Sequence, residues 1–532
     1  MANRLGTHLA RKAKMATLQK IMRNHYRDSV SLMQLSSRLV DLSGVVQASA
    51  VMATDSNLAL LKEAGLLEGK NDAGPNDLLI VIQGDDEALL ERALAKAEDQ
   101  LNERRAVWSE DSVKQRIAPR SIEMGLNCMV KANLALISVP GEYAGSEALK
   151  ALHLGLHVML FSSNVDLSEE IQLKTYARDH DLIVMGPDCG SAIINGIPLG
   201  FANVVRRGDI GCVAASGSGL QQVTSLIDRA GEGISQAIGT GGRDLHVNVG
   251  GISMSQGLET LAEDPATKVI VLISKPPAPE VSERVLEKAA RVGKPVVVSF
   301  LGVNPASVKR PNVFASGTLE EAANMAVALS QGKNPDHNGE VNIKYENQTT
   351  AAASKLSPEQ KFIRGLYSGG TLGYEAVLLL NDLVGPVNTN TPMEPKFALA
   401  DVWQSKQHTV IDLGDGVFTR GRPHPMIDHR LRNERILREA ADSEVAVILL
   451  DVILGYGSHI DPASEMIPVI DNARKIAARA SRQLVFVGSV CGTSSDPQGL
   501  SGQESALRNA GMILTESNAQ AVRLAAKIVR GR

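Results

Sequence analysis

Two short turns rich in glycine and serine carry the residue types that hold a phosphoryl group or another small anion. Each follows an apolar run and precedes an amphipathic stretch: residues 216–219 in "DIGCVAASGSGLQQVTSLIDRAG" and residues 368–371 in "FIRGLYSGGTLGYEAVLLL". Such a strand–turn–helix directs the free N–H groups and the partial positive charge of a helix N-terminus at a ligand, and glycine lets the backbone come close. An ordinary strand-to-helix connection with a Ser or Thr cap is the alternative. The predicted phosphate-binding residues are Ser216, Gly217, Ser218, Gly219, Ser368, Gly369, Gly370 and Thr371.

Other segments that follow apolar runs carry cationic and imidazole side chains. They are "GTGGRDLH", "LISKPP", "DLGDGVFTRGRPHPMIDHR" and "ILGYGSHIDP". Arginine binds phosphate and carboxylate groups with two parallel hydrogen bonds, whereas the alternative is a surface loop with weak salt bridges. The predicted catalytic residues are Arg243, Arg420, Arg422 and His424, and the predicted substrate-binding residues are Gly241, Gly242, Lys275 and His459.

Composition and spacing exclude several classes of partner. The His and Asp residues show neither HxxxH nor facial-triad spacing, so we expect no metal site. The net charge of −4 and the aromatic content of 3% argue against nucleic acid. No apolar run approaches the roughly 20 residues of a membrane span. The four cysteines form no CxxC pair and have no adjacent base, which favours buried inert thiols and a cytoplasmic location.

The 532 residues divide into several predicted domains. Residues 1–26 are basic and are predicted to form a solvated helical arm, with a mitochondrial transit peptide as the less favoured alternative. Residues 27–106 suggest a small ferredoxin-like α+β module, whose first strand we place directly after Asp28. Residues 117–204 alternate strands with helices, which predicts a Rossmann-like half domain with a parallel sheet.

Residues 205–332 and 359–532 read as a repeat, separated by a polar linker at residues 333–358. "SGSGLQQVTSL" matches "SGGTLGYEAVL", and "GKPVVVSFLGVNPAS" matches "SRQLVFVGSVCGTSS", in the same order. We therefore predict tandem flavodoxin-like domains, each a parallel sheet covered by helices and both with one strand order. The turn occurs twice because the domain occurs twice. We expect the two turns to lie on opposite sides of one cleft and to bind the same anion, with Arg243 and one or more of Arg420 and Arg422 completing the charge.

The stretch from "MGPDCGSAIINGIPLG" through "VAASGSGLQQVTSL" to "DPATKVIVLISKPP" is similar to the α subunit of succinyl-CoA synthetase, over residues 133–329. With "SGGTLGYEA", "GRPHPMID" and "DVILGYGSHIDP", the whole chain resembles the FdrA-type acyl-CoA synthetase-like proteins. The resemblance implies a CoA-binding-like domain at 117–204, a succinyl-CoA synthetase-like domain at 205–332 and a CoA-ligase-type domain at 359–532.

Departures from succinyl-CoA synthetase limit which chemistry the resemblance implies. The phosphorylated histidine of that family lies in a Gly-His-Ala-Gly loop, and here the matching stretch is "KRPNVFASGT". No carboxylate stands in "ISKPP", where the family has a glutamate facing that histidine. The glycine-rich CoA-binding turn and the ATP-grasp domain are missing. We therefore expect no phosphohistidine and no certain cofactor, with CoA kept as an alternative.

FdrA-type proteins are associated with allantoin and purine catabolism and with oxamate carbamoyltransferase activity, together with partner subunits. The resemblance therefore implies carbamoyl transfer between carbamoyl phosphate and oxamate, in the breakdown of oxalurate, by an oligomer with partner subunits of the same pathway. A succinate–CoA ligase-like acyl-CoA synthetase and a non-catalytic scaffold subunit are the alternatives.

Overall fold

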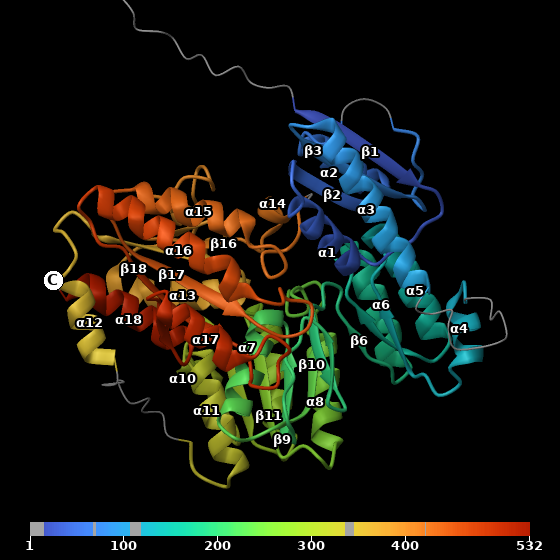
Figure 1. Ribbon diagram of the computed structural model, residues 1–532. Coiled ribbons are helices and arrows are strands. Elements are labelled where there is room, and N and C mark those ends of the chain that lie inside the picture. The colour runs from blue at the N-terminus through green and yellow to red at the C-terminus, as the bar shows by residue number, and fades with distance from the viewer. Residues whose placement is uncertain (1–14, 68–70, 107–118, 336–344, 421, 532) are drawn as a thin grey trace, which may run out of the picture. The chain divides into compact units, whose positions relative to one another are not determined.

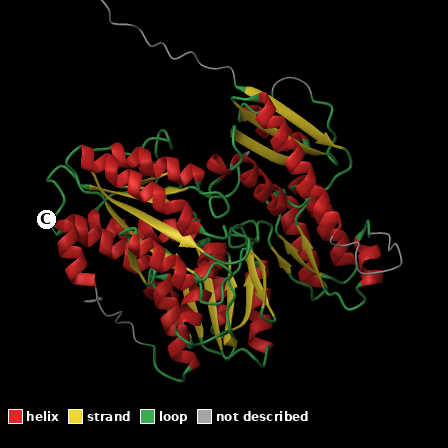
Figure 2. Ribbon diagram, in the orientation of Figure 1, coloured by secondary structure: helices red, strands yellow, loops and turns green. Residues whose placement is uncertain are grey.

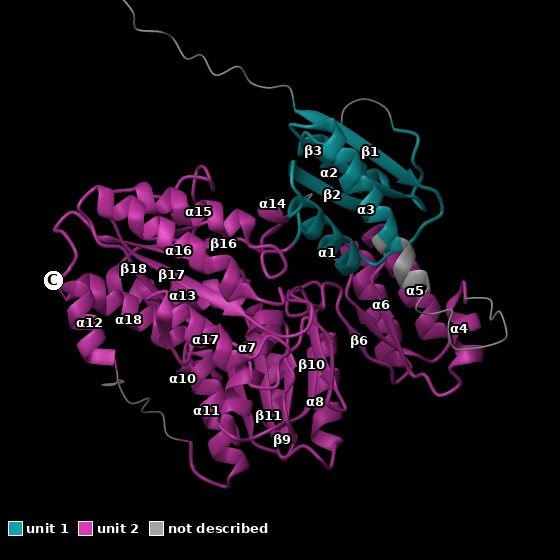
Figure 3. Ribbon diagram, viewed as in Figure 1, with its two compact units in different colours: residues 1–118, 420–423 teal, residues 119–419, 424–532 magenta. Residues whose placement is uncertain are grey.

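The computed structural model describes residues 15–67, 71–106, 119–335, 345–420 and 422–531. The chain divides into two compact units, drawn in different colours in Figure 3: residues 1–118 with 420–423, and residues 119–419 with 424–532. Among the described helices, none combines the length and the apolar character that a bilayer crossing requires.

The first unit is an α+β module with a three-stranded antiparallel sheet in the order β1-β3-β2. This is the order of the first three strands of a ferredoxin-like sheet, so the predicted fold class is confirmed for this unit. Helices α1 and α3 pack on the sheet around a core that includes Leu35, Leu39 and Ile82. The elements are β1 (Ala16–Met22), α1 (Ser29–Val40), β2 (Val45–Met52), α2 (Asp55–Glu63), β3 (Leu78–Gly84) and α3 (Glu87–Ala106).

The prediction of a helical N-terminal arm is wrong for residues 16–22, which form β1. Ala16 and Leu18 pack against the core, while Thr17 and Gln19 are exposed, and this alternation outweighs the basic charge of the segment. The strand predicted directly after Asp28 is also wrong, because the Asp28 side chain accepts a hydrogen bond from the Ser31 N–H and starts helix α1 there. Residues 1–14 lie outside the described residues.

The second unit begins with a parallel sheet of three short strands, in the order β4-β5-β6. This agrees with the parallel half domain predicted before residue 205. The elements are α4 (Ile122–Cys128), β4 (Leu134–Ile137), α5 (Gly141–His153), β5 (His157–Leu160), α6 (Leu167–Asp179) and β6 (Val184–Met185). A hairpin that the sequence did not reveal, β7 (Ser191–Ile194) and β8 (Ile197–Gly200), then joins the edge of the next sheet.

Two larger parallel sheets follow, and they share one strand order. The first sheet reads β10-β9-β11-β12-β13, and the second reads β16-β14-β17-β18-β19. Both are the flavodoxin-like order 2-1-3-4-5, so the predicted tandem fold class is confirmed. The strands of the first sheet are β9 (Arg207–Ala214), β10 (Ile234–Gly239), β11 (Val269–Ser274), β12 (Val296–Phe300) and β13 (Val313–Ala315). Those of the second are β14 (Phe362–Tyr367), β16 (Thr409–Asp412), β17 (Val445–Ile453), β18 (Val485–Cys491) and β19 (Ile513–Thr515), with the short β15 (Asn388–Thr389) at its edge.

Helices cover both faces of each of these sheets (Figure 2). Helices α7 (Gly217–Arg229) and α11 (Leu319–Ser330) cover one face of the first sheet, and α13 (Gly370–Val384) and α18 (Asn518–Arg530) cover one face of the second. These four helices contact one another and share a single apolar core (Figure 1). The outer faces carry α8 (Ile252–Glu263) and α9 (Pro279–Ala289) on the first sheet, and α15 (Arg430–Ala441), α16 (Pro462–Arg479) and α17 (Leu500–Asn509) on the second.

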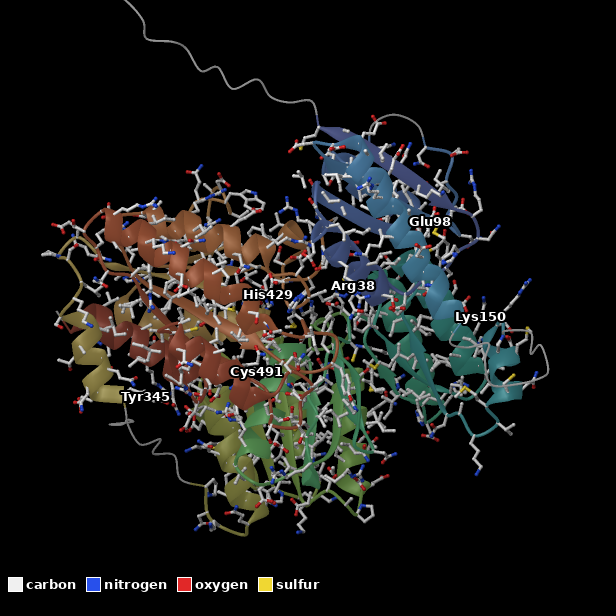
Figure 4. The ribbon with its side chains drawn as sticks, viewed as in Figure 1. Arg38, Glu98, Lys150, Tyr345, His429 and Cys491 are labelled. Atoms are coloured by element: carbon white, nitrogen blue, oxygen red, sulfur yellow. The ribbon has the colours of Figure 1, made fainter. Side chains whose placement is uncertain are left out.

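A buried carboxylate ties the two halves of this helix layer together. Glu375 of α13 accepts hydrogen bonds from the Leu319 N–H at the start of α11 and from the Asn518 side chain of α18. The predicted linker is partly helical: α12 (Glu346–Ala353) packs against α18, and Tyr345 lies in the shared core (Figure 4). The two flavodoxin-like domains are therefore joined over an extended interface.

Candidate functional site

The two predicted phosphate-binding turns lie against each other at the carboxyl ends of β9 and β14. The Ser216 and Thr371 hydroxyl oxygens are 2.7 Å apart, and the Thr371 N–H donates to the Ser218 hydroxyl at 3.2 Å. Residues 216–219 and 368–371, called the turn junction below, therefore bring the N-termini of α7 and α13 together. In open parallel sheets this end of the strands is where ligands bind.

The α7 side of the turn junction keeps N–H donors available. Ser216 caps its own helix by accepting the Gly219 N–H at 3.0 Å. The N–H groups of Gly217 and Ser218 have no hydrogen-bond partner among the described residues. Gly217, the first residue of α7, is also partly exposed, whereas Ser218 is buried. This side of the junction therefore offers donors to an anion.

On the α13 side, a buried ion pair already occupies most of the donors. The Asp451 carboxylate accepts the N–H groups of Ser368 at 2.8 Å and Gly369 at 2.7 Å. Arg432 of α15 donates to the Ser368 hydroxyl at 2.9 Å and to the Asp451 carbonyl at 2.7 Å. Two of the predicted phosphate donors are thus committed to a carboxylate within the protein. Gly370, the first residue of α13, is partly exposed, and its N–H has no partner among the described residues.

Sequence reasoning missed Asp451 and Arg432. The available signal was an acidic residue near the end of "VAVILLDVI", a strand that is otherwise wholly apolar. Burial raises the pKa of Asp451, while Arg432 and the two turn N–H groups oppose that shift. The pair fixes the α13 turn in place.

The repeat is chemically asymmetric at this site. The strand pairings place Asp451 in the second sheet where Ser274 lies in the first, and Asp412 where Thr240 lies. The α7 end of the junction is therefore flanked by neutral hydroxyl groups, and the α13 end by two carboxylates. A phosphoryl group fits the neutral end better, because it carries negative charge itself.

Asp412 lies at the end of β16, beside the first residue of α13. Its Oδ1 accepts the Gly414 N–H at 2.9 Å, and its Oδ2 has no hydrogen-bond partner among the described residues. A Cβ added to Gly370 would collide with that Oδ2, so the carboxylate touches the helix N-terminus. Asp412 is 8% exposed, and burial raises its pKa to about 6, with Lys275 opposing the shift.

His424 approaches the same place from the loop after β16. Its Nδ1 accepts the Met426 N–H at 3.2 Å, which assigns the ring proton to Nε2. A Cβ added to Gly414 would lie 2.8 Å from the His424 Nε2 and 3.2 Å from the Asp412 Oδ1. Burial lowers the pKa of His424 to about 4, so the ring is neutral at pH 7 and presents Nε2–H as a donor.

The other predicted site residues have different surroundings. Arg243 pairs with Glu170 at 2.9 Å, beside a fully buried Lys174 that also binds Glu170 and Asp244. The positive φ of Gly241 and its contact with the Pro187 carbonyl explain that glycine, while Gly242 is exposed. The structure thus gives Arg243 and Gly241 structural partners at the boundary between β10 and the preceding half domain.

Four further predicted residues, Lys275, His459, Arg420 and Arg422, complete the set. The Lys275 Nζ lies 5.6 Å above the ring centre of Tyr374, a residue of α13. The His459 ring lies 5.3 Å from that of His429, which Figure 4 labels. Arg420 and Arg422 group with the first unit.

The cysteines agree only in part with the prediction of inert buried thiols. Cys189, Cys212 and Cys491 are buried, and burial raises the pKa of each well above its ordinary value. Cys128, at the end of α4, is exposed, so the prediction is wrong for that residue. Its helix contains no buried side chain that would cover it.

We predict that the protein acquires no phosphohistidine when it is incubated with ATP or with an acyl phosphate. His424 is the nearest imidazole, but phosphorylation at Nε2 needs a lone pair on that atom, and the Met426 N–H holds the ring in the opposite tautomer. The measurement is acid-labile, base-stable radiolabel on the intact chain, with a succinyl-CoA synthetase α subunit as the positive control. Label that disappears in His424→Asn would contradict the prediction.

Three family models match the chain. The CoA-ligase model matches residues 366–528, the CoA binding domain model matches residues 205–302, and the model described as AllF, heavy metal-associated domain matches residues 15–117. The CoA binding match therefore falls after residues 117–204, for which the sequence predicted CoA-binding-like character. The first unit corresponds to the third match.

Similar proteins cover either the whole chain or its middle. The Escherichia coli (strain K12) protein described as uncharacterized protein YahF is 44% identical over 510 residues, which are 95% of this chain and 97% of that protein. Succinate–CoA ligase [ADP-forming] subunit alpha of Aquifex aeolicus is 26% identical over 34% of this chain and 59% of its own length. Among solved structures, the apo form of dinucleotide-forming acetyl-coenzyme A synthetase 1 of Ca. Korarchaeum cryptofilum is 16% identical, covering 75% of this chain and 83% of its own, with a TM-score of 0.28.

The first unit and the half domain can each be compared with the ligand class that was expected there. Residues 15–117 contain no cysteine and a single histidine, His25, so they lack the soft ligands of a heavy-metal site. In the half domain, a Cβ on Gly141, the first residue of α5, would collide with the carbonyl oxygens of Ser163 and Asn164. Carbonyl oxygens thus lie close to the helix start at which the sequence predicted CoA-binding-like character.

Proposed function

The chain belongs to the FdrA-type family of succinyl-CoA synthetase-like proteins, and from that membership we propose that it transfers a carbamoyl group between carbamoyl phosphate and oxamate. In the catabolic direction, the same reaction splits oxalurate with phosphate. The CoA-ligase superfamily is the coarser assignment, and the carbamoyl reaction is our refinement of it.

The observation that carries the proposal is the turn junction, where two helix N-termini meet at the carboxyl ends of two parallel sheets. The first residues of the two helices, Gly217 and Gly370, are partly exposed and their N–H groups have no partner among the described residues, so we propose that both bind one ligand. Each helix terminus contributes about 0.3–1 kcal/mol toward an exposed anion, and up to about 2 kcal/mol when partly buried. A phosphoryl group held there needs no Walker lysine.

The same arrangement supports direct transfer without a phosphorylated enzyme. Phosphate is the leaving group of carbamoyl phosphate, and preorganised N–H donors stabilise the charge that develops on it. The neutral His424 can donate its Nε2–H to the carbonyl oxygen of the carbamoyl group. The carboxylate of the oxamate acceptor then needs a cationic partner. We propose Lys275 for this role, because its charge acts on Asp412, which lies beside the first residue of α13. We propose that partner subunits of the same pathway complete the acceptor site.

An acyl-CoA synthetase is the second candidate function. The matches to the CoA binding domain and CoA-ligase families favour it. In that reading the turn junction handles an acyl phosphate, and CoA supplies the thiol acceptor. Both candidates place the same phosphoryl group against the same donors, so they differ in the acceptor.

A ligand-stabilisation screen separates these functions, because a ligand that binds the folded state stabilises it by mass action. At 100 times its dissociation constant, a ligand adds about 2.7 kcal/mol to the free energy of unfolding. We expect carbamoyl phosphate to raise the melting temperature, oxamate to add to that effect, and CoA and ATP to have none. Oxalurate formation from carbamoyl phosphate and oxamate, assayed with and without partner subunits, then tests turnover.

The outcomes discriminate among the three hypotheses. Stabilisation by CoA together with an acyl phosphate would favour the acyl-CoA synthetase. If none of these ligands stabilises the protein and no turnover occurs with partner subunits present, the result favours the hypothesis of a non-catalytic scaffold subunit.

A further inference from the structure

We propose that Asp412 is the group that exchanges a proton with the acyl acceptor at the turn junction. This assignment rests on the proposed carbamoyl transfer and adds the acid–base residue that the family resemblance leaves unnamed. Three independent observations support it: the position of the carboxylate, its unused oxygen, and the charges around it.

The position of Asp412 places a proton acceptor next to the proposed phosphoryl site. Its Oδ2 touches the first residue of α13, as the collision with a Cβ on Gly370 shows. The partly exposed Gly370 N–H is in turn one of the free donors of the junction. When the phosphate of carbamoyl phosphate lies against these donors, the Asp412 carboxylate is within reach of the acceptor nitrogen. That nitrogen attacks the carbamoyl carbon.

The unused oxygen distinguishes Asp412 from its buried neighbour Asp451. Both oxygens of the Asp451 carboxylate accept hydrogen bonds, from two turn N–H groups and from Arg432. Asp412 is also more than nine-tenths buried, yet only its Oδ1 is bonded, to the Gly414 N–H. The Oδ2 atom of Asp412 is therefore available to accept a hydrogen bond from the N–H of an acceptor.

The charges that face Asp412 come from several elements. Lys275, after β11, stabilises the carboxylate, while Asp451 of β17 and Asp415 of its own loop disfavour it, and the neutral His424 lies beside it. The net result is a carboxyl group whose pKa is raised to about 6, chiefly by burial. A proton-transfer group is most effective when its pKa lies near the working pH.

The step balances as follows in the direction of oxalurate synthesis. The amide nitrogen of the acceptor forms a bond to the carbamoyl carbon, and the bond between that carbon and the phosphate oxygen breaks, with its electron pair leaving on phosphate. One proton of the attacking nitrogen passes to the Asp412 Oδ2. In the reverse direction, phosphate attacks the ureido carbon, and Asp412 returns the proton to the departing nitrogen.

The test compares Asp412→Asn with Asp415→Asn in the full chain, with partner subunits present. Asp415→Asn is the matched control, because it removes the same charge three residues away. Among the described residues, the Asp415 side chain accepts a hydrogen bond from the Val417 N–H and so caps the short helix α14 (Gly416–Thr419). We expect Asp412→Asn to lower kcat by about 10²–10⁴-fold. It should also abolish the rise of kcat/KM with pH near 6 that the wild type and the control show.

A melting experiment gives a second readout, which does not depend on turnover. The folded state raises the pKa of Asp412 above its ordinary value of 3.8, so it stabilises the protonated form, and that stabilisation is lost as the pH rises through about 6. Asp412→Asn should therefore melt above the wild type at pH 8, and at the same temperature near pH 4. A variant with this melting pattern and wild-type kinetics would overturn the proton-transfer role.

Failure of the assignment and failure of the proposed function are distinguishable. A wild type that neither binds carbamoyl phosphate nor forms oxalurate with partner subunits overturns the function, and the role of Asp412 with it. An active wild type whose Asp412→Asn variant keeps both the rate and the pH profile overturns the assignment alone.

Discussion

Replacing Arg432 by methionine is expected to lower the free energy of unfolding of the second unit by about 3–5 kcal/mol. The arginine is 1% exposed and lies 3.2 Å from the fully buried Asp451 carboxylate. Without it, Asp451 keeps its charge in a site from which water is excluded, and only two backbone N–H groups compensate it. Methionine preserves the apolar stem of the side chain, so the loss reports mainly on the charge.

Chemical denaturation monitored by circular dichroism measures this change, and the midpoint is compared with that of Arg438→Met. Arg438 lies on the same helix, α15, but it is exposed, and among the described residues it bonds only to the Trp403 carbonyl. We therefore expect a change within about 0.5 kcal/mol. The double variant Arg432→Met/Asp451→Asn should recover part of the loss, because the stranded charge is removed. Equal midpoints for Arg432→Met and Arg438→Met would show that the ion pair does not hold the turn.

Replacing Gly217 by valine is expected to abolish tight binding of carbamoyl phosphate while leaving the fold intact. A Cβ at this position meets only the Ser191 hydroxyl, at 3.5 Å, which is an ordinary contact. The branched side chain would instead fill the space in front of the α7 N-terminus and displace a phosphoryl group from the free N–H donors. Hydrogen bonds to a charged group are worth about 1.5–3 kcal/mol each, so losing two weakens binding by roughly 10²–10⁴-fold.

Gly502→Val is the control, since Gly502 also lies in the first turn of a helix, is exposed, and has no atom near its Cβ position. Isothermal titration with carbamoyl phosphate and the melting temperature without ligand are measured on both variants. Gly369 is unsuitable for this test, because its Cβ would lie 2.9 Å from Ile453 and 3.0 Å from Ser218, so the junction itself would shift. Unchanged affinity in Gly217→Val would show that the α7 turn is an ordinary connection.

The strand order and the meeting of the two turns followed from the sequence because both depend on local patterns that occur twice. Apolar runs, glycine turns and amphipathic stretches recur in the same order, and the flavodoxin-like order is one of few ways to pack them. The strand at residues 16–22 was missed because it lies within a basic N-terminal segment, and the charge of that segment was given more weight than the apolar residues of the strand. The helical part of the predicted linker was missed because most of its side chains are polar or small.

The chemistry of the turn junction was less predictable than its location. The sequence placed all eight turn residues at one site on a symmetric argument, in which both helix ends hold one anion. The structure makes the site asymmetric through Asp451 and Asp412, whose counterparts in the first sheet are Ser274 and Thr240. Arg432 meets Asp451 across 19 positions of sequence, and no local pattern reveals which buried charge pairs with which.

The shared layer of α7, α11, α13 and α18 gives the second unit the architecture of a fused dimer. Each flavodoxin-like domain contributes two helices to a core that neither closes alone, much as two subunits would. Because the two domains belong to one chain, their association is intramolecular, so it depends on an effective concentration and not on the concentration of the protein.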